Sequence, residues 1–240
     1  MQNSVHPGSN EVRDLPLSGN LSPARPASSD LALDLWRFTA TRAESVHVPP
    51  DGCRDLIVVV TRAGAPVCFV SALADTTETP AFESGDHAVG VRLRPGAQFD
   101  EAALLTLLRQ GERIDDSDLM NAIGAAVRLD VRVQEALDCL QEAPPLGIAH
   151  ARLGVSERSL ERLLVQRTRR GPLYWRNLAR ARRCARALAG AEPLAHLAAE
   201  HGYSDQAHMT RDLQRWFGAA PAQLRRMPEF LGTLAASGHG

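Results

Sequence analysis

The sequence predicts an α+β protein in which a β-rich N-terminal part precedes an all-α C-terminal part. Between residues 31 and 99, short runs of β-branched and aromatic residues alternate with Gly and Pro, which is typical of antiparallel strands joined by turns. From Glu101 onward, Ala and Leu recur at helical spacing. The formal charge also changes sign near Leu146. With 240 residues, the chain is long enough for two domains that each bury a core.

The uneven charge indicates which part meets a polyanion. The chain has a formal net charge of −1, but the first 145 residues hold 12 Arg against 21 acidic residues, a balance of −9. From Leu146 to the end, 15 Arg stand against 7 acidic residues, a balance of +8. Arg side chains that neutralise phosphates release counterions and supply most non-specific DNA affinity. We therefore expect double-stranded DNA to bind the C-terminal part, and a merely solvated charged surface is the alternative.

The N-terminal end and the cysteines argue against several other classes of protein. Residues 1–30 are polar and rich in Pro, Ser and Asn, which predicts a disordered tail and not a signal peptide. No later stretch approaches the ~20 apolar residues of a membrane span, so we expect a cytoplasmic protein with no membrane partner. The cysteines show no Cys-x-x-Cys spacing and are expected to be reduced and mostly buried. They are Cys53, Cys68, Cys139 and Cys184.

Residues 31–130 are expected to form an antiparallel sandwich or barrel with a helical extension. Runs such as 55–60 and 66–70 are β-rich, and Gly and Pro recur between such runs at intervals of about eight to fifteen residues. Helical patterns follow over 102–110 and 119–129. The two helices are a candidate dimer surface, with internal packing as the alternative.

A domain of two helix-turn-helix units is predicted over residues 131–228, with 229–240 as a C-terminal tail. A first helix over 131–142 stops before Pro144-Pro145. A short helix over 146–153 then ends at Gly154, and Ser156 is the expected N-cap of a helix over 157–168. Its core stripe is Leu160, Leu163 and Leu164, and its other face carries Arg158, Glu161, Arg162 and Arg169.

The same pattern recurs 48 residues later. A helix over 194–201 precedes Gly202-Tyr203-Ser204 and a helix over 205–217, with Ser204 as the expected N-cap. The core stripe is Met209, Leu213, Trp216 and Phe217, and the other side carries Gln206, Thr210, Arg211 and Gln214. A polar helix held by a tight turn suits the major groove of DNA, and two copies make this interpretation much stronger than one.

A linker helix over 172–189 is expected to join the two units. Its Pro start and the Gly190 that follows it fit helix boundaries. At roughly 1.5 Å per residue it spans about 27 Å, somewhat less than the ~34 Å of one DNA turn, so the two recognition helices are expected to enter successive major grooves. Its arginines either contact phosphates or face solvent. They are Arg176, Arg180, Arg182, Arg183 and Arg186.

Residues 133–226 resemble the DNA-binding domain of the AraC/XylS family of transcription regulators. The resemblance lies in Gly154-Val155-Ser156 with Leu160 and Arg162, in the linker run 178–183, and above all in the run from Ala198 to Met209 with Arg211, which closes at 217–221 and 224–226. Two positions depart from the family pattern: Arg169 stands where a glycine usually ends the first recognition helix, and Met209 stands where Phe is usual.

The resemblance implies a role for particular residues. The base-reading positions of the family match Arg158, Glu161 and Arg162 in the first unit and Gln206, Thr210 and Arg211 in the second. These types suit the task, since Arg forks onto guanine, Gln pairs with adenine and Glu accepts from cytosine. Ser156, Ser204 and the linker arginines, Arg180 among them, are implied phosphate contacts. RNA polymerase, a small-molecule effector and a second copy of the chain are the further partners that such a regulator implies.

The N-terminal part resembles, less specifically, a cupin-like sensory domain found in some such regulators. The resembling stretches are 47–56, which includes Pro50-Asp51-Gly52-Cys53, and 90–96. They either border an effector pocket or simply hold turns and strands.

A metal-dependent cupin-type enzyme fused to a DNA-binding domain is the alternative function. It is disfavoured because His47 and His87 lack a His-x-His pair or a nearby Glu at ligand spacing. A DNA-repair methyltransferase is disfavoured because its four-cysteine zinc module is missing, and a protein-interaction module because a doubled recognition unit has little use without DNA. We expect no cofactor and no catalysis.

Overall fold

The computed structural model describes residues 30–62, 64, 66–108, 114–142, 144–235 and 238–240. The expected disordered tail therefore lies outside the described residues, except for Asp30. The chain divides into two compact units. The first takes the chain up to Val48, then Cys53–Leu73 and Thr79–Leu129; the second takes Pro49–Gly52, Ala74–Glu78 and Asp130–Gly240.

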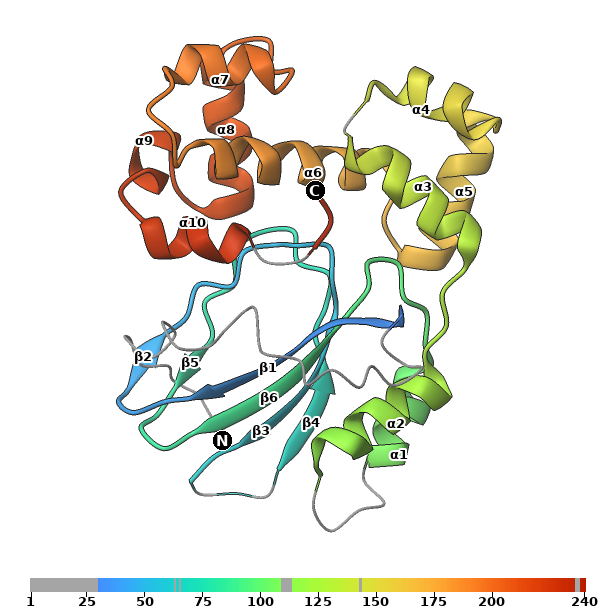
Figure 1. Cartoon of the computed structure of the whole chain (residues 1–240), viewed down its shortest axis with the longest axis vertical. Helices are drawn as coiled ribbons and strands as arrows, with labels where there is room; N and C mark the ends of the chain where they lie inside the picture. Colours follow the sequence, from blue (N-terminus) through green and yellow to red (C-terminus); the bar gives the residue numbers. More distant parts are fainter. Residues whose placement is uncertain (1–29, 63, 65, 109–113, 143, 236–237) are drawn as a thin grey trace. The chain divides into compact units, whose positions relative to one another are not determined.

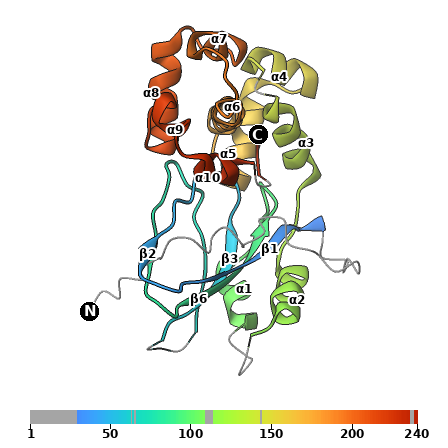
Figure 2. The same ribbon diagram turned by 60° about the vertical axis from the view of Figure 1, so that its left-hand side comes forward.

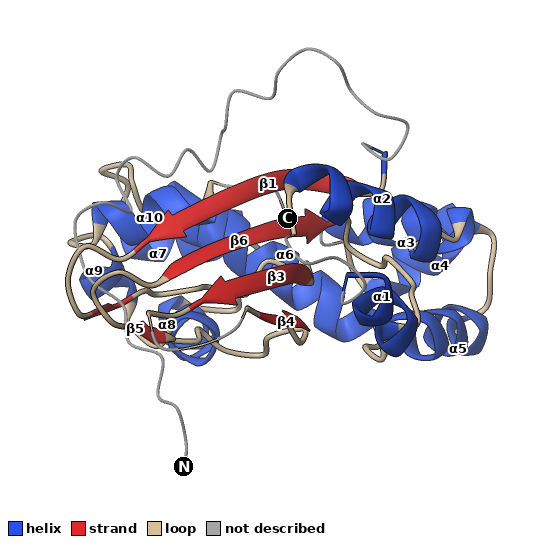
Figure 3. Ribbon diagram, turned by 90° about the horizontal axis from the view of Figure 1, so that it is seen from below, coloured by secondary structure: helices blue, strands red, loops and turns tan. Residues whose placement is uncertain are grey.

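The first unit contains a four-stranded antiparallel sheet. Its strand order is β1 (Ala32–Thr39), β6 (His87–Leu93), β3 (Asp55–Val60) and β4 (Val67–Val70), which can be followed in Figure 3. A two-stranded sheet pairs β2 (Glu44–Ser45) with β5 (Ala81–Phe82). Two helices follow, α1 (Glu101–Leu108) and α2 (Asp116–Ala126). The α+β class and the antiparallel pairing are confirmed, whereas the cupin-like character remains a prediction.

Strand alternation gives the four-stranded sheet two different faces. On one face, Leu56 and Val91 pack with Leu104 of α1 and Ile123 of α2 in a single buried cluster. The apolar stripes of these helices therefore serve internal packing, which was the alternative to a dimer surface. The other face carries a smaller cluster around Phe38, Val59 and Ala88.

On this second face, the Trp36 indole lies across Gly90 of the neighbouring strand. A Cβ atom at Gly90 would lie 2.3 Å from two carbons of the indole, so a larger residue there must displace the ring. The Trp36 Nε1 donates to Asp55 Oδ2 at 2.7 Å, and Arg92 lies 3.5 Å from the same carboxylate. Burial raises the pKa of Asp34, which is paired in register with Arg92.

The second unit is helical and is arranged along α6 (Pro172–Ala187). One helix-turn-helix unit, α4 (Leu146–Leu153) with α5 (Glu157–Thr168), lies toward one end of α6, and the other, α7 (Leu194–Glu200) with α8 (Gln206–Phe217), toward the other end (Figure 1). The remaining helices are α3 (Val131–Gln141), α9 (Pro221–Leu224) and α10 (Pro228–Leu234). Figure 2 looks nearly along α6 and shows the other helices of this unit around it.

The core of this unit explains why α6 is almost entirely covered. Trp175, Leu178, Ala181, Cys184 and Ala185 are all fully buried. A large apolar cluster joins α6 to α7, α8 and α10. The predicted helices over 146–153 and 157–168 are confirmed residue for residue, and the linker helix ends two residues before the prediction.

The predicted tail over 229–240 is wrong for its described part. Pro228 begins α10, and Phe230, Leu231 and Leu234 are buried in the same core as α6 and α8. Their spacing places them on one face of a helix, which is the sequence signal for this short element. His239 is buried as well, and its Nε2 lies 3.1 Å from the Trp175 carbonyl.

Two short segments from the N-terminal half of the sequence belong to the second unit. Asp51 accepts a hydrogen bond from the His239 backbone N–H at 2.7 Å through its carbonyl. Asp75 forms an ion pair with Arg170 at 2.6 Å, and Thr77 donates its backbone N–H to the Trp216 carbonyl at 2.9 Å. A domain boundary read from sequence order alone misses these segments.

Candidate nucleic-acid interface

The first helix-turn-helix unit is built as the sequence predicts. Gly154 ends α4 in the left-handed region with φ 64°, where glycine carries no Cβ penalty. Ser156 then caps α5, because its Oγ accepts a hydrogen bond from the Ser159 backbone N–H at 3.2 Å. Glu157 and Arg158 at the start of α5 are exposed, and the first turns of a recognition helix are the part that reaches base edges.

The outward face of α5 carries a row of polar side chains. Leu160, Leu164 and Thr168 are buried, so the opposite side of the helix faces solvent. Arg158 and Arg162 are exposed one turn apart on that side. Gln166, which was not among the predicted site residues, continues the row one turn further. Its i+8 spacing from Arg158 was the available signal.

Glu161 lies apart from these two arginines, on the flank of α5. A Cβ atom added to Gly171 would lie 2.7 Å from Glu161 Oε1, so this carboxylate rests against the turn that leads into α6. At ~100° per residue, the exposed Glu161 lies about 100° around the helix from Arg162 and about 60° from Arg158, at the edge of the outward row.

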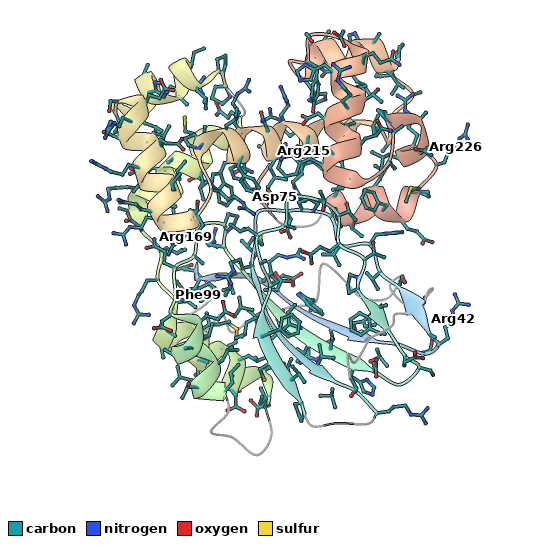
Figure 4. The ribbon with its side chains drawn as sticks, turned by 180° about the vertical axis from the view of Figure 1, so that it is seen from behind. Arg42, Asp75, Phe99, Arg169, Arg215 and Arg226 are labelled. Carbon is teal, nitrogen blue, oxygen red and sulfur yellow. The ribbon has the colours of Figure 1, made fainter. Side chains whose placement is uncertain are left out.

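Arg169 ends α5 in the left-handed region with φ 61°. Among the described residues, no other residue except glycine has a positive φ. Its backbone N–H donates to the Val165 carbonyl at 3.0 Å, as in an αL cap. The unusual residue at this position therefore keeps the glycine-type conformation, and α5 ends at Thr168. Figure 4 labels Arg169 at the end of α5 and Arg226 beyond α9, far from each other in this unit.

The second recognition helix begins one residue later than predicted. Its N-cap is Asp205, whose Oδ1 accepts from the His208 backbone N–H at 2.7 Å, and not Ser204. This hydrogen bond is the main cause that lowers the pKa of Asp205. The Ser204 hydroxyl instead lies 3.2 Å from Asp205 Oδ2 and 3.1 Å from His208 Nδ1. Ser204 remains exposed beside the start of α8.

The predicted reading residues of α8 lie on two adjoining faces. Gln206 and Arg211 are exposed, and Thr210 is half-buried. The Thr210 hydroxyl donates to the Gln206 carbonyl at 2.8 Å, which leaves its lone pairs and methyl group for a ligand. Arg215, also exposed, lies over the Trp216 ring at 4.8 Å.

Arg180 is not on the exposed surface where a phosphate contact requires it. It is 7 % exposed, and its Nη2 donates to Asp212 Oδ2 at 2.9 Å. The expected phosphate role of Arg180 is therefore wrong for this arrangement, since both sides of α6 are packed against other helices.

The other linker arginines donate to main-chain carbonyl groups, and this answers the question that the sequence left open. Arg176 donates to the Pro144 carbonyl at 2.6 Å, and Arg183 donates to the Gln141 carbonyl at the end of α3. Arg182 is fully buried and donates to the carbonyls of Pro50 and Leu234. Cations at helix C-termini satisfy carbonyls that the helix leaves unpaired. These arginines therefore stabilise the packing of α6 against the segments that carry those carbonyl groups.

The described residues hold no candidate metal centre. No group of three His, Cys, Asp or Glu side chains is placed to bind an ion within them. His47 Nδ1 lies 3.3 Å from the Thr79 hydroxyl, and His87 Nδ1 lies 3.0 Å from that of Thr39. No helix in the described part of the chain is both long and apolar enough to cross a membrane. All four cysteines are free thiols.

Residues 149–227 match the family model described as "Helix-turn-helix domain". A comparison with curated proteins finds no match. Among solved structures, the C-terminal domain of AraT, a response regulator from Geobacillus stearothermophilus, is 24% identical with a TM-score of 0.39, over 42% of this chain and 88% of that one. The DNA-binding domain of AdpA in complex with a target DNA is 24% identical with a TM-score of 0.36, over 42% and 91%. ToxT from Vibrio cholerae is 8% identical with a TM-score of 0.44, over 84% and 98%.

Proposed function

We propose that this chain is a DNA-binding transcription regulator of the AraC type, whose helix-turn-helix domain at residues 149–227 reads two neighbouring blocks of one operator. One recognition helix, α5, reads the first block, and the other, α8, reads the second. The observation that carries the proposal is the pair of capped recognition helices with exposed polar faces, joined by a single packed helix.

The dimensions of the linker support reading in successive grooves. The 16 residues of α6 span about 24 Å at ~1.5 Å per residue. The recognition helices lie toward its two ends (Figure 1). Successive major grooves on one face of DNA are ~34 Å apart.

Each exposed side chain of the recognition helices takes a role that its chemistry allows. Arg162 and Arg211 donate to guanine, and Gln206 pairs with adenine. Arg158 shares the outward face of α5 with Arg162 and reads the neighbouring position. Ser156, Ser204 and Thr210 contribute contacts at the edge of each helix, and Glu161 on its flank accepts from cytosine only if its side chain turns outward.

Single-base substitution tests these roles. The affinity of the full chain, Arg162→Ala and Arg211→Ala is measured on an operator in which each base pair is changed in turn. We expect each variant to lose about 1–3 kcal/mol on the intact operator and to become indifferent to the identity of one or two base pairs. Arg226→Ala is the control, because Arg226 is exposed but lies outside both recognition helices.

Uniform weakening on every sequence, with a salt slope reduced by about one, would instead assign Arg162 or Arg211 to phosphates. In that case the base-reading role is wrong for that arginine, although DNA binding stands.

The first unit is proposed to regulate DNA binding, either by holding a small-molecule effector or by pairing two copies of the chain. It holds 11 Arg against 14 acidic residues, a balance of −3, and this lack of net positive charge disfavours direct contact with DNA. An effector acts only if it binds one conformation of the regulator better than another. Sedimentation of the full chain with and without operator DNA decides between a monomer and a dimer. A monomer under both conditions rules out pairing of two copies and leaves effector binding as the means of regulation. RNA polymerase is the further partner proposed for the bound regulator.

A further inference from the structure

We propose that Arg180, Tyr203 and Asp212 form a positioning cluster that fixes the rotation of the second recognition helix, and so sets the spacing between operator blocks that the protein accepts. The three residues come from three different elements: α6, the turn after α7, and α8. The inference rests on the proposed function, because it requires that both recognition helices read DNA.

The contacts within the cluster are short and buried. Arg180 Nη2 lies 2.9 Å from Asp212 Oδ2, with 8 % and 11 % of the two side chains exposed. The Tyr203 hydroxyl donates to the same carboxylate oxygen at 3.1 Å. The Arg180 guanidinium lies 4.2 Å from the centre of the Tyr203 ring, a cation–π contact away from water. Each residue therefore touches both of the others.

Tyr203 also holds α8 at a second point one turn away. Its ring meets the His208 ring edge-on with centroids 5.2 Å apart, and His208 precedes Asp212 by four residues. Two contacts one turn apart on the same side of a helix fix its rotation about its own axis. Because adjacent residues point ~100° apart, an inward Asp212 turns Arg211 toward the exposed side.

Stability alone does not account for this arrangement. Buried ion pairs are weak stabilisers, since apolar residues of similar volume often serve as well. Arg180 Nε is, moreover, buried with no hydrogen-bond partner among the described residues, which costs free energy. A directional contact retained despite that cost is the kind that specifies register. Its burial also separates Arg180 from phosphates.

Operator spacing is the property that such a cluster controls. With roughly 10–10.5 base pairs per turn, one inserted base pair rotates the second block by about 35° and moves it along the axis. A rotationally fixed α8 tolerates this poorly, whereas a loosened α8 follows the displaced block.

The test compares three DNA probes with the full chain: both operator blocks, the first block with the second scrambled, and both blocks with one inserted base pair. The variants are Tyr203→Phe, which keeps the ring, and the double variant Arg180→Met with Asp212→Leu, which replaces the ion pair by apolar residues of similar size. Glu229→Gln, an exposed carboxylate of α10, is the control. The salt slope of the double variant is also measured.

We expect both variants to bind the two-block probe about tenfold more weakly, to bind the first-block probe within about twofold of wild type, and to lose most of the penalty for the inserted base pair. An unchanged insertion penalty, or equal loss on all three probes, overturns the positioning role. A salt slope lower by about one overturns it too, since it assigns Arg180 to a phosphate. Failure of the wild-type chain to prefer two blocks over one refutes the proposed function instead.

Discussion

The arginines of the second unit are of two kinds, those exposed to solvent and those buried in the protein, and residue type alone does not distinguish them. Arg158 and Arg162 are exposed on α5, as their spacing from the buried leucines predicts. Arg180 and Arg182 look equally charged in the sequence but are buried on α6. Periodicity identifies the covered face of a helix packed on one side, but it fails for α6, which is packed on nearly every side.

Arg169 carries backbone strain that glycine relieves. Its φ of 61° lies in the left-handed region, which costs a residue with a Cβ roughly 1–2 kcal/mol. We expect Arg169→Gly to raise the free energy of unfolding by about 0.5–1 kcal/mol, after the entropy that glycine adds to the unfolded chain. Urea unfolding measures it. The matched control is Gln166→Gly in the exposed interior of α5, expected to lower stability by about 1 kcal/mol. A loss in Arg169→Gly contradicts the αL assignment.

His239 makes the second unit sensitive to mild acid. Burial lowers its pKa to about 4, against an opposing effect of its hydrogen bond to the Trp175 carbonyl. The unfolded chain, with a pKa near 6.5, binds the proton first, so stability is complete above pH ~6.5 and falls as the pH decreases toward 4. Between pH 7 and 5 this residue contributes a loss of about 2 kcal/mol.

His239→Gln tests this, because the amide keeps a donor for the Trp175 carbonyl but does not titrate. Chemical unfolding at pH 7 and pH 5 is expected to show a loss smaller by about 2 kcal/mol in the variant. Burial also lowers the pKa of His201, which accounts for part of the remaining slope. If the free energy of unfolding falls equally between pH 7 and pH 5 in both proteins, His239 is not a neutral, buried residue.

At the scale of elements, the sequence predicts those helix ends whose hydrogen bonds join residues close together in the chain. The Ser156 cap and the Gly154 turn were predictable because both rest on hydrogen bonds within four residues. At α8 two capping residues stand side by side, and sequence preference does not choose between Ser204 and Asp205. The strand order β1-β6-β3-β4 depends on pairing between distant segments, which no local pattern encodes.

The Ser156 cap sets the stability of the first recognition helix. Ser156→Ala removes the acceptor for the Ser159 N–H and is expected to cost about 1 kcal/mol of unfolding free energy. Ser156→Asp restores an acceptor and should recover most of it, as thermal unfolding of both variants will show. If alanine is neutral, the Ser156 hydroxyl does not cap α5 in solution.

At the scale of the whole molecule, the sequence shows the opposite net charges of residues 1–145 and 146–240, but it does not show which arginines are exposed to a ligand. Fifteen arginines follow Leu146, yet many are held inside the second unit by carbonyls or carboxylates. Within the described part of this unit, the exposed arginines that form no ion pair are Arg158, Arg162, Arg169, Arg211, Arg215 and Arg226.

The salt dependence of DNA binding should therefore reflect the exposed arginines only. If all six met phosphates, the slope of log affinity against log salt would be about −5 per bound chain, and each of them that meets a base edge or no DNA makes it shallower by about one. Titrations between roughly 50 and 200 mM salt measure it. A slope near −13, as expected if all 15 arginines met phosphates, would mean that the linker arginines are released on binding.

Selection of random DNA by the full-length protein at near-physiological salt tests whether α5 and α8 read DNA as a pair. We expect a motif of two short blocks whose centres lie about one helical turn, 10–10.5 base pairs, apart. Each block should lose its base preference when the matching recognition helix carries Arg162→Ala or Arg211→Ala. Recovery of sequence-blind, salt-sensitive binding alone would contradict paired reading by α5 and α8.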